Sequence, residues 1–433
     1  MRYRIETERG DLFDTSIIIS MLVRISEDVP FGQMKAAFEK ACRVHEVLNT
    51  KVVIESSGEA YYVTSDETHN GFEDTDKSIQ ELIDLNERKR FHIEDGEFIR
   101  GFKSADGILF MMHHLGGDGK SLLYFIETFM RCLNGEAVEP VPFRNLTVEN
   151  IPEGSELSSL YEMLLKYWNK KWKKEKKVFS FEDMDKAYEC YWKDHKSVID
   201  IKRYEKAELD GMHKKAKEAG VTITSYLITD MIKNMDIKAD IGLAVDGRTD
   251  GNRSMGNQAT GISFQYRYNK SVSFEENARK IQKLMKRKLE DKRRLYLVLL
   301  FMGKLDPTLV DALSLEHAGY FSSKLSKKVA ELLGYGSKVK DISLTNLTRV
   351  DIPTVYGDHK IEELVFVPPV VSYGKNIIGI VTANDVMNIA VHKIPNPNIR
   401  SKSDKEKQQE ADNHNESLES LCQREDSSTS FID

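Results

Sequence analysis

Residues 108–121, ILFMMHHLGGDGKS, decide how the rest of the chain is interpreted. Five apolar residues lead into two adjacent histidines, His113 and His114, and a glycine-rich turn follows them. Asp118 lies in this turn, and the pattern becomes helical after Gly119. The segment therefore predicts a buried strand, a turn and a helix, with imidazole groups presented where the strand ends.

The two histidines are expected to face opposite sides, because successive side chains of a strand alternate. One imidazole can then point into a cleft while the other packs in the interior. Such a pair would chelate a metal poorly, and no cysteine or histidine cluster elsewhere has metal-ligand spacing, so we expect no metal site. Asp118 can order the turn or pair with a distant cation. The alternative is that both histidines are core residues, but HHxxxDG arises by chance in only about one chain in a thousand.

The sequence around this segment predicts a mixed α/β first half, residues 1–150. Its elements are a strand at 16–23, an amphipathic helix at 34–47, hairpins at 51–63 and 98–112, and a helix at 120–133. Prolines at positions 140, 142 and 152 favour a connection at the end of this half.

A connecting helical segment is expected at residues 151–195. Its main helix, 156–177, ends in seven lysines within twelve residues. We expect its apolar residues to form one stripe that packs inward: Leu160, Met163, Leu164, Tyr167, Trp168 and Trp172. The interleaved lysines and aromatic residues also allow an anionic surface or nucleic acid as a partner, but a solvated helix is the preferred interpretation.

The second α/β region is assigned to residues 196–398. It has predicted helices at 206–219, 222–234 and 274–294, and late strands at 339–345, 361–367, 376–382 and 387–392. Residues 399–433 are too poor in apolar side chains to offset their ordering entropy, so a disordered tail is predicted.

Composition excludes several classes of protein. The chain has 433 residues with 63 Lys+Arg against 69 Asp+Glu, and this balance argues against nucleic acid as the main partner. No apolar run is long enough to span a bilayer, and the N-terminal residues lack the apolar core of a secretory signal, so we expect a cytoplasmic protein. The four cysteines have no paired spacing and are interpreted as reduced thiols: Cys42, Cys132, Cys190 and Cys422.

The HHxxxDG pattern, matched by His113, His114, Asp118 and Gly119, resembles the signature of an acyltransferase superfamily. That superfamily contains chloramphenicol acetyltransferase, the condensation domains of nonribosomal peptide synthetases and alcohol O-acetyltransferases. Further similarity lies in the helix at 34–47 and in three later elements: Asp246-Gly247-Arg248, Gly256-Asn257 and Leu344-Thr345-Asn346-Leu347. The sequence departs from the family pattern at Val44 and Asn49, where arginines are usual, and at Thr348, where glycine is usual.

The resemblance implies two α/β sandwich domains with mostly antiparallel sheets that flank a central channel. It implies His114 as general base, His113 as its support from the strand's other face, and Asp118 as a structural residue paired with Arg248. Asn257 and Asn346 become candidates for stabilising the oxyanion, although each can equally be a turn or cap residue.

Three functions follow from the resemblance. The preferred one is transfer of an acyl group from acyl-CoA, as co-substrate, to the hydroxyl or amine of a small acceptor, because no carrier-protein or adenylation segment is found in the sequence. The second is a free-standing condensation domain that uses a thioester bound to a carrier protein. The third is a non-catalytic interaction protein that keeps the fold without the chemistry.

Overall fold

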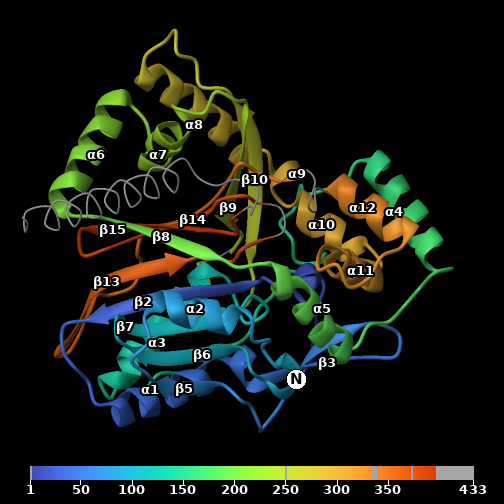
Figure 1. The fold of residues 1–433 in the computed structure, drawn as a ribbon, viewed down its shortest axis with the longest axis horizontal. Helices are drawn as coiled ribbons and strands as arrows, with labels where there is room; N and C mark the ends of the chain where they lie inside the picture. Colours follow the sequence, from blue (N-terminus) through green and yellow to red (C-terminus); the bar gives the residue numbers. More distant parts are fainter. Residues whose placement is uncertain (1, 249–250, 334–338, 372–373, 396–433) are drawn as a thin grey trace, which may run out of the picture. The chain divides into compact units, whose positions relative to one another are not determined.

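The strand that leads into the histidines lies in the middle of a six-stranded sheet (Figure 1). β7 (Gly107–His113) pairs antiparallel with β2 (Ile18–Ile25) on one side and with β6 (Ile99–Ser104) on the other. The strand order is β12-β13-β2-β7-β6-β5, with β5 at Gly71–Asp74. The predicted hairpin of β6 and β7 is confirmed, and β7 is buried along almost its whole length.

Two strands of this sheet come from the second half of the chain. β13 (His359–Val367) pairs antiparallel with β2, so that Phe366 lies opposite Met21, and β12 (Val355–Tyr356) extends the edge. The two halves therefore share a sheet, an exchange that the contiguous division of the sequence did not include.

Helices α1 (Phe31–Val44) and α3 (Gly119–Leu133) contact each other and pack on the sheet, and α2 (Ile79–Glu87) completes the first half. The apolar face predicted for α1 is buried, as is most of α3. Phe125 of α3 lies 5.7 Å from Phe38 of α1 and 5.4 Å from Phe110 of β7, measured between ring centroids. Burial of these aromatic rings fixes α3 against the strand that carries the histidines.

A small three-stranded sheet lies beside this half, with the order β1-β4-β3. Its strands are β1 (Arg2–Arg4), β3 (Thr50–Ile54) and β4 (Ala60–Thr64). β3 and β4 form the antiparallel hairpin expected from the sequence.

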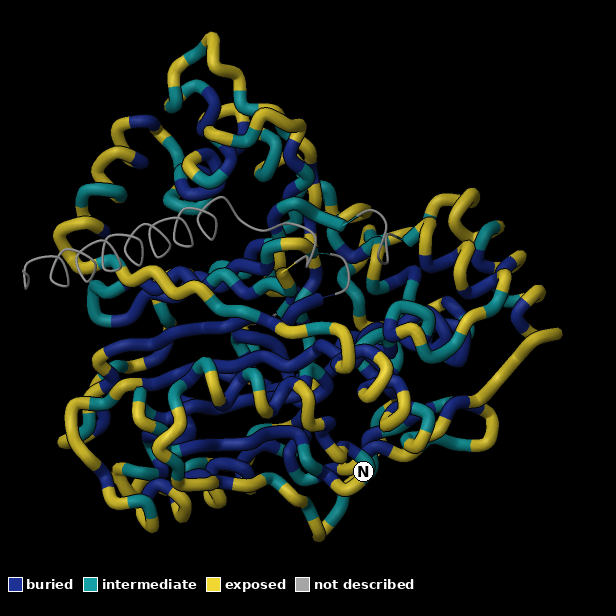
Figure 2. The backbone as a smooth tube through the Cα atoms, viewed as in Figure 1, coloured by how far each residue is buried: buried dark blue, intermediate teal, exposed yellow. Residues whose placement is uncertain are grey.

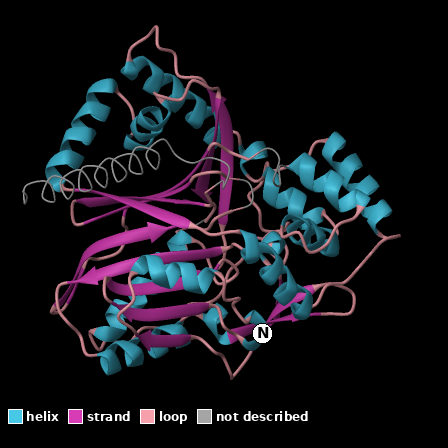
Figure 3. Cartoon of the chain, viewed as in Figure 1, coloured by secondary structure: helices cyan, strands magenta, loops and turns pink. Residues whose placement is uncertain are grey.

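The second six-stranded sheet has the order β10-β9-β11-β14-β15-β8. Its bounds are β8 (Val198–Tyr204), β9 (Ala239–Asp246), β10 (Ala259–Tyr266), β11 (Ile342–Arg349), β14 (Ile377–Ala383) and β15 (Val386–Lys393). β11 runs parallel to both neighbours, and the other pairs are antiparallel. The helices α6 (Lys206–Ala219), α7 (Ile223–Ile232) and α8 (Phe274–Glu290) accompany this sheet (Figure 3), and a core that includes Ile228, Ile241, Leu344 and Ile380 holds them together.

The connecting segment and the region before β11 form a helical group. It comprises α4 (Ser159–Trp172), α5 (Phe181–Asp194), α9 (Lys292–Leu295), α10 (Leu297–Lys304), α11 (Pro307–His317) and α12 (Lys324–Leu333). Trp172 of α4 is fully buried and donates through Nε1 to Thr308 Oγ1 of α11, 2.7 Å away.

The prediction of one inward stripe on α4 was wrong for half of its members. Of the predicted residues, Trp168 and Trp172 are buried and Leu164 is half-buried, whereas Leu160, Met163 and Tyr167 are exposed, because neighbouring helices cover only one side of α4 (Figure 2). Leu165, which was not predicted, is buried with the two tryptophans.

The computed structural model describes residues 2–248, 251–333, 339–371 and 374–395. The predicted disordered tail, residues 399–433, and Cys422 lie outside the described residues; the other three cysteines are free thiols. Among the described helices, none is both long and apolar enough to cross a membrane.

A buried ion pair joins α2 to β15. His392 Nε2 lies 3.2 Å from Glu87 Oε1, and both side chains are almost fully buried. His392 Nδ1 lies 2.7 Å from the carbonyl oxygen of Pro368. Burial by itself would lower the pKa of His392, but the Glu87 carboxylate and the Pro368 carbonyl outweigh it, and the pKa lies above its ordinary value of 6.5.

This pair is expected to make stability depend on pH. Because the pKa is raised on folding, the contribution of His392 is fully present below about pH 6.5 and is lost as the pH rises through the higher pKa of the folded state. Urea midpoints measured from about pH 6 to about pH 9 are expected to fall more in the wild type than in His392→Gln, which cannot titrate. Parallel pH profiles for the two proteins would contradict this assignment.

Candidate functional site

The turn that follows β7 is fixed by its own backbone. Gly116 N–H donates to the carbonyl of His113 (2.8 Å between N and O), and Gly117 N–H donates to the carbonyl of His114 (3.1 Å). His114 N–H in turn donates to the carbonyl of Ile17, 3.1 Å away, just before β2. The position of His114 therefore depends on both the turn and the neighbouring strand.

His113 is an interior residue. Its ring is fully buried, and Nδ1 accepts a hydrogen bond from the backbone N–H of Leu115 at 3.2 Å. Burial lowers the pKa of His113 to about 3, and the nearby charges of His114, Arg90 and Arg100 act in the same direction. His113 is thus a neutral side chain that accepts from the turn, in a position to support it.

His114 is half-buried, in contrast to its neighbour. Its Nδ1 is buried and has no hydrogen-bond partner within the part of the chain that the structure describes. Burial lowers the pKa of His114 below 6.5, although the carboxylates of Asp118 and Asp14 partly oppose this. The ring is therefore a neutral imidazole at neutral pH, the form that can accept a proton.

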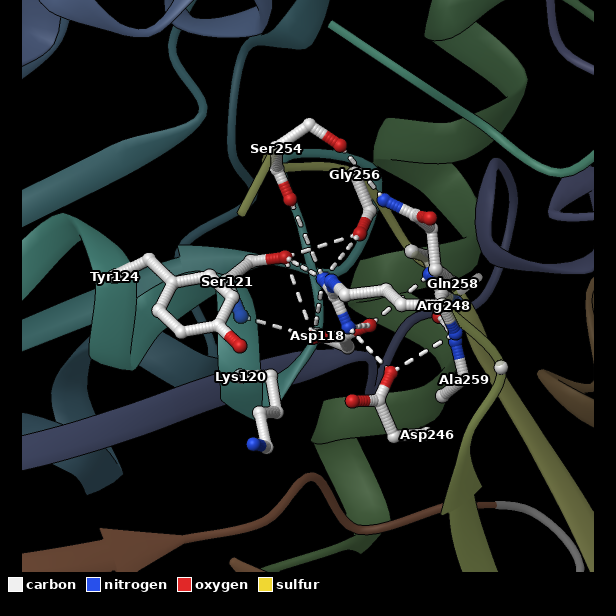
Figure 4. Close-up of polar contacts among 12 residues, drawn as sticks. Asp118, Lys120, Ser121, Tyr124, Asp246, Arg248, Ser254, Gly256, Gln258 and Ala259 are labelled. Carbon is white, nitrogen blue, oxygen red and sulfur yellow. Dashed lines mark hydrogen bonds and ion pairs between the residues drawn. The ribbon is translucent and has the colours of Figure 1, made fainter. Parts of the chain in front are cut away.

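Asp118 closes the turn and begins α3. Its Oδ1 accepts the backbone N–H of Ser121 at 2.9 Å, which is an N-cap bond. Two guanidinium nitrogens of Arg248 donate to the two carboxylate oxygens, Nη1 to Oδ2 at 2.9 Å and Nη2 to Oδ1 at 3.0 Å (Figure 4). The ion pair expected between Asp118 and Arg248 is confirmed, and it connects the two halves of the chain.

This pair is deeply buried, with side-chain exposures of 3 % for Arg248 and 6 % for Asp118. Burial would raise the pKa of Asp118, but Arg248 and the backbone N–H groups of Ser121 and Gln258 hold it below its ordinary value. The pKa of Arg248 is raised, because Asp118 and Asp246 outweigh the effect of burial. Both groups are charged, and their bidentate geometry fixes the turn in one orientation.

Further hydrogen bonds surround the pair. Arg248 Nη2 donates to Ser121 Oγ at 2.8 Å, and that hydroxyl donates to the carbonyl of Gly256 at 3.0 Å. Gln258 N–H donates to Asp118 Oδ2 at 3.0 Å. Gly256 belongs to the Gly256-Asn257 element that carries part of the family resemblance, whereas Ser121 and Gln258 were not among the predicted site residues. Only Ser121 had a local signal, its position three residues after a capping aspartate.

Close packing explains the glycine of the motif. A Cβ atom on Gly119 would lie 2.9 Å from Phe366 Cζ of β13 and 3.2 Å from Leu347 Cδ2 of β11. A Cβ atom on Gly117 would lie 2.3 Å from that of Ser121. A side chain at position 119 would push the first turn of α3 away from the strands of the second half, and one at position 117 would clash with that turn itself.

Two more ion pairs connect α3 to the second half. Lys120 Nζ lies 2.8 Å from Asp351 Oδ2, and Arg253 pairs with Glu127. The guanidinium of Arg253 also lies 4.2 Å above the ring of Tyr124. Together with the Asp118–Arg248 ion pair, these contacts hold the first half of α3 in place.

The two candidate oxyanion donors lie in different elements. Asn257 Nδ2 donates to Asp11 Oδ2 at 2.8 Å, and Asn346 Nδ2, on β11, donates to Thr224 Oγ1 at 2.9 Å. Burial raises the pKa of Asp11 to about 7, although the bond from Asn257 opposes this. Each amide has thus committed one N–H to a neighbouring oxygen, so an oxyanion would have to use the second.

Thr348 has a left-handed backbone, with φ at +58°, where β11 loses its regular register beside β14. A β-branched residue is strained in this conformation and glycine is not. We therefore expect Thr348→Gly to raise the free energy of unfolding by up to about 1 kcal/mol, after allowance for the greater freedom of the unfolded chain. Urea denaturation measures this change. Thr345→Gly, in the regular part of the same strand, should instead destabilise, and the same sign for both variants would contradict the argument.

One group of potential metal ligands lies outside this site. His92, Glu94 and Asp95 place ligand atoms within 4.8 Å of one another. The carboxylate of Glu94 is already bound by Arg90, at 2.6 and 2.8 Å. The cluster is therefore explained by an ion pair and gives no reason to propose a metal.

Comparisons with known proteins identify the fold. No protein-family model matches the sequence, and no curated protein matches it. Among solved structures, the first condensation domain of the CDA synthetase aligns with a TM-score of 0.60 at 12% identity, over 95% of this chain and 94% of that one. Polyketide synthase associated protein 5 from Mycobacterium tuberculosis aligns with a TM-score of 0.56 at 12% identity, over 91% and 92%.

A mutant starter condensation domain of rhizomide synthetase, solved in complex with C8-CoA and Leu-SNAC, aligns with a TM-score of 0.57 at 9% identity, over 93% of this chain and 90% of that one. At these identities the similarity establishes the fold alone. The chain has the two-lobed condensation-domain fold, as the resemblance in the sequence implied.

Proposed function

We propose that the protein transfers an acyl group from a thioester to the hydroxyl or amine of a small acceptor, with His114 as the general base. The observation that carries the proposal is the half-buried, neutral imidazole of His114 on a turn that Asp118 and Arg248 hold in place. A neutral imidazole with a depressed pKa can take a proton near pH 7.

In the proposed reaction the acceptor attacks the thioester carbonyl as His114 removes its proton. A tetrahedral oxyanion forms, the carbon–sulfur bond breaks, and the proton on His114 passes to the departing thiolate. The products are an ester or amide and a free thiol, so atoms and charges balance without any added oxidant or reductant.

The remaining residues are assigned supporting roles. We infer that His113, Asp118, Gly119 and Arg248 are positioning residues, because their contacts fix the turn. Asn257 and Asn346 are proposed to stabilise the oxyanion through the amide N–H that each has not committed to a neighbour.

The donor is proposed to be acyl-CoA, and the rhizomide synthetase domain solved in complex with C8-CoA supports this choice. A thioester carried by a carrier protein is the second candidate, because several of the similar structures are condensation domains of synthetases. A non-catalytic protein of the same fold is the third.

A panel of donors separates these candidates. Free thiol would be measured with acyl-CoAs of short to long chain and with acylated carrier proteins, each with and without mixed alcohols and amines. Thiol release from acyl-CoA that requires an acceptor supports the first candidate, and release only from the acylated carrier supports the second. No release from either donor would favour the non-catalytic protein.

The pH dependence of transfer follows from the lowered pKa of His114. The base form persists to lower pH than in a free imidazole, so kcat/KM should stay constant around neutral pH and decline only below about pH 6.5. A pH profile of kcat/KM measures this limb. A decline that begins above pH 6.5 would show that the base is not the depressed imidazole described here.

A further inference from the structure

The outer face of α4 carries apolar side chains that no other part of the described chain covers. Leu160, Met163 and Tyr167 are 59 %, 60 % and 50 % exposed. Their spacing of three and four residues puts them on one stripe of the helix. Single exposed apolar residues are ordinary on protein surfaces, but three large ones in a row mark an interaction site.

Lysines border this stripe on both sides. At 3.6 residues per turn, Lys166 and Lys170 project beside one edge of the stripe and Lys171 beside the other. Lys171 Nζ lies 4.9 Å from the centroid of the Tyr167 ring. The buried stripe of Leu165, Trp168 and Trp172 faces the opposite way, so the apolar stripe and its lysines form an outward surface, here called the α4 face.

Most lysines of the α4 face and of the segment just after the helix have no carboxylate partner among the described residues. Residues 166–177 contain seven lysines, all exposed. In the part of the chain that the structure describes, Lys177 is the only one within ion-pair distance of a carboxylate, with Nζ 3.7 Å from Asp183 Oδ1. The positive charge of Lys328, on the neighbouring α12, also acts on Tyr167. This local excess of positive charge contrasts with the net charge of −6 of the whole chain.

We propose that the α4 face binds the surface of an anionic lipid bilayer. Leucine, methionine and tyrosine side chains can enter the region between headgroups and acyl chains, while lysines on both sides contact lipid phosphates and carboxylates. Nucleic acid would leave Leu160 and Met163 without a partner. A protein partner would need its own groove to receive this one face of α4, whose other side packs against α10 and α12. The proposal is independent of the acyl transfer assigned to His114.

Cosedimentation with vesicles tests the proposal on the full chain. Wild type should bind vesicles of phosphatidylcholine with about 30 % phosphatidylserine and not pure phosphatidylcholine, and binding should weaken strongly in about 0.5 M salt. Lys166→Glu/Lys170→Glu/Lys171→Glu should lower the partition coefficient at least about tenfold. The variant Leu160→Ser/Met163→Ser should lower it severalfold without any change in charge.

Matched controls separate the α4 face from total charge and from general hydrophobicity. Lys214→Glu/Lys215→Glu/Lys217→Glu makes the same change in charge on exposed positions of α6, and Val355→Ser removes an exposed apolar side chain elsewhere. Both should bind like wild type. Thermal melts confirm that each variant is folded, which is expected because every replaced side chain is exposed.

Three results would overturn the proposal. They are no binding of wild type to anionic vesicles, equal binding to pure phosphatidylcholine, and a loss in the α6 variant as large as in the α4 variant. Binding of wild type to immobilised polyglutamate without any binding to vesicles would assign the α4 face to an acidic protein instead.

Discussion

Replacing His114 with alanine is expected to lower the rate of acyl transfer by a factor of about 10² to 10⁴, the usual contribution of a general base. The loss should appear in kcat, because the imidazole acts on the acceptor proton during the chemical step. Thiol release at saturating donor and acceptor measures this effect.

The same variant should keep its fold. The His114 ring is half-buried and its Nδ1 has no hydrogen-bond partner within the described residues, so its removal breaks no hydrogen bond at that atom. His213→Ala, at an exposed position of α6, is the matched control and should transfer at the wild-type rate. If His114→Ala is folded and retains full activity, His114 is not the base.

The second large effect is expected at the ion pair between the two halves. Arg248→Ala leaves the buried carboxylate of Asp118 without its cation, and loss of one member of such a pair costs about 3 to 5 kcal/mol. Urea denaturation measures the loss. Because the pair also fixes the turn that carries His114, any variant that remains folded should transfer acyl groups more slowly.

An exposed ion pair provides the control. Arg349 Nη2 lies 2.8 Å from Asp385 Oδ1, and the side chains are 62 % and 41 % exposed. Arg349→Ala should therefore cost only about 0 to 1 kcal/mol. The double variant Asp118→Ala/Arg248→Ala should lose less than the sum of the two single losses. Equal losses for Arg248→Ala and Arg349→Ala would contradict the structural role given to the buried pair.

The elements that the sequence predicted well are those defined by local patterns. The hairpins of β3 with β4 and of β6 with β7 follow from alternation across short turns, and the buried face of α1 follows from helical spacing. Local patterns do not show which elements meet. The pairing of β13 with β2 joins residues more than 300 positions apart, as Phe366 opposite Met21 illustrates, and no short-range signal specifies it.

The error on α4 has a similar cause. Two apolar stripes run along this helix. With a rotation of about 100° per residue, they lie roughly 140° apart around the helix axis, and periodicity alone does not show which stripe other helices cover. The structure buries the stripe of Trp168 and Trp172 against neighbouring helices and leaves that of Met163 and Tyr167 exposed. The prediction joined members of both.

For the candidate site, the family resemblance was sufficient to pair Asp118 with Arg248, whereas the role of His114 as the base stays a prediction. The partners of the two asparagines could not be predicted, because they lie far away in the chain. Asn257 bonds to Asp11, 246 positions earlier, and Asn346 bonds to Thr224, 122 positions earlier. Such contacts depend on how the sheets and loops come together.

The most direct test of the central claim is to measure free thiol and acylated acceptor together by mass spectrometry, with wild-type protein and a thioester donor. Acyl transfer predicts an acceptor heavier by one acyl group and one thiol for each product molecule. Thiol without acylated acceptor would mean that water is the acceptor and that the protein is a hydrolase. No product with either acyl-CoA or an acylated carrier protein would contradict acyl transfer altogether.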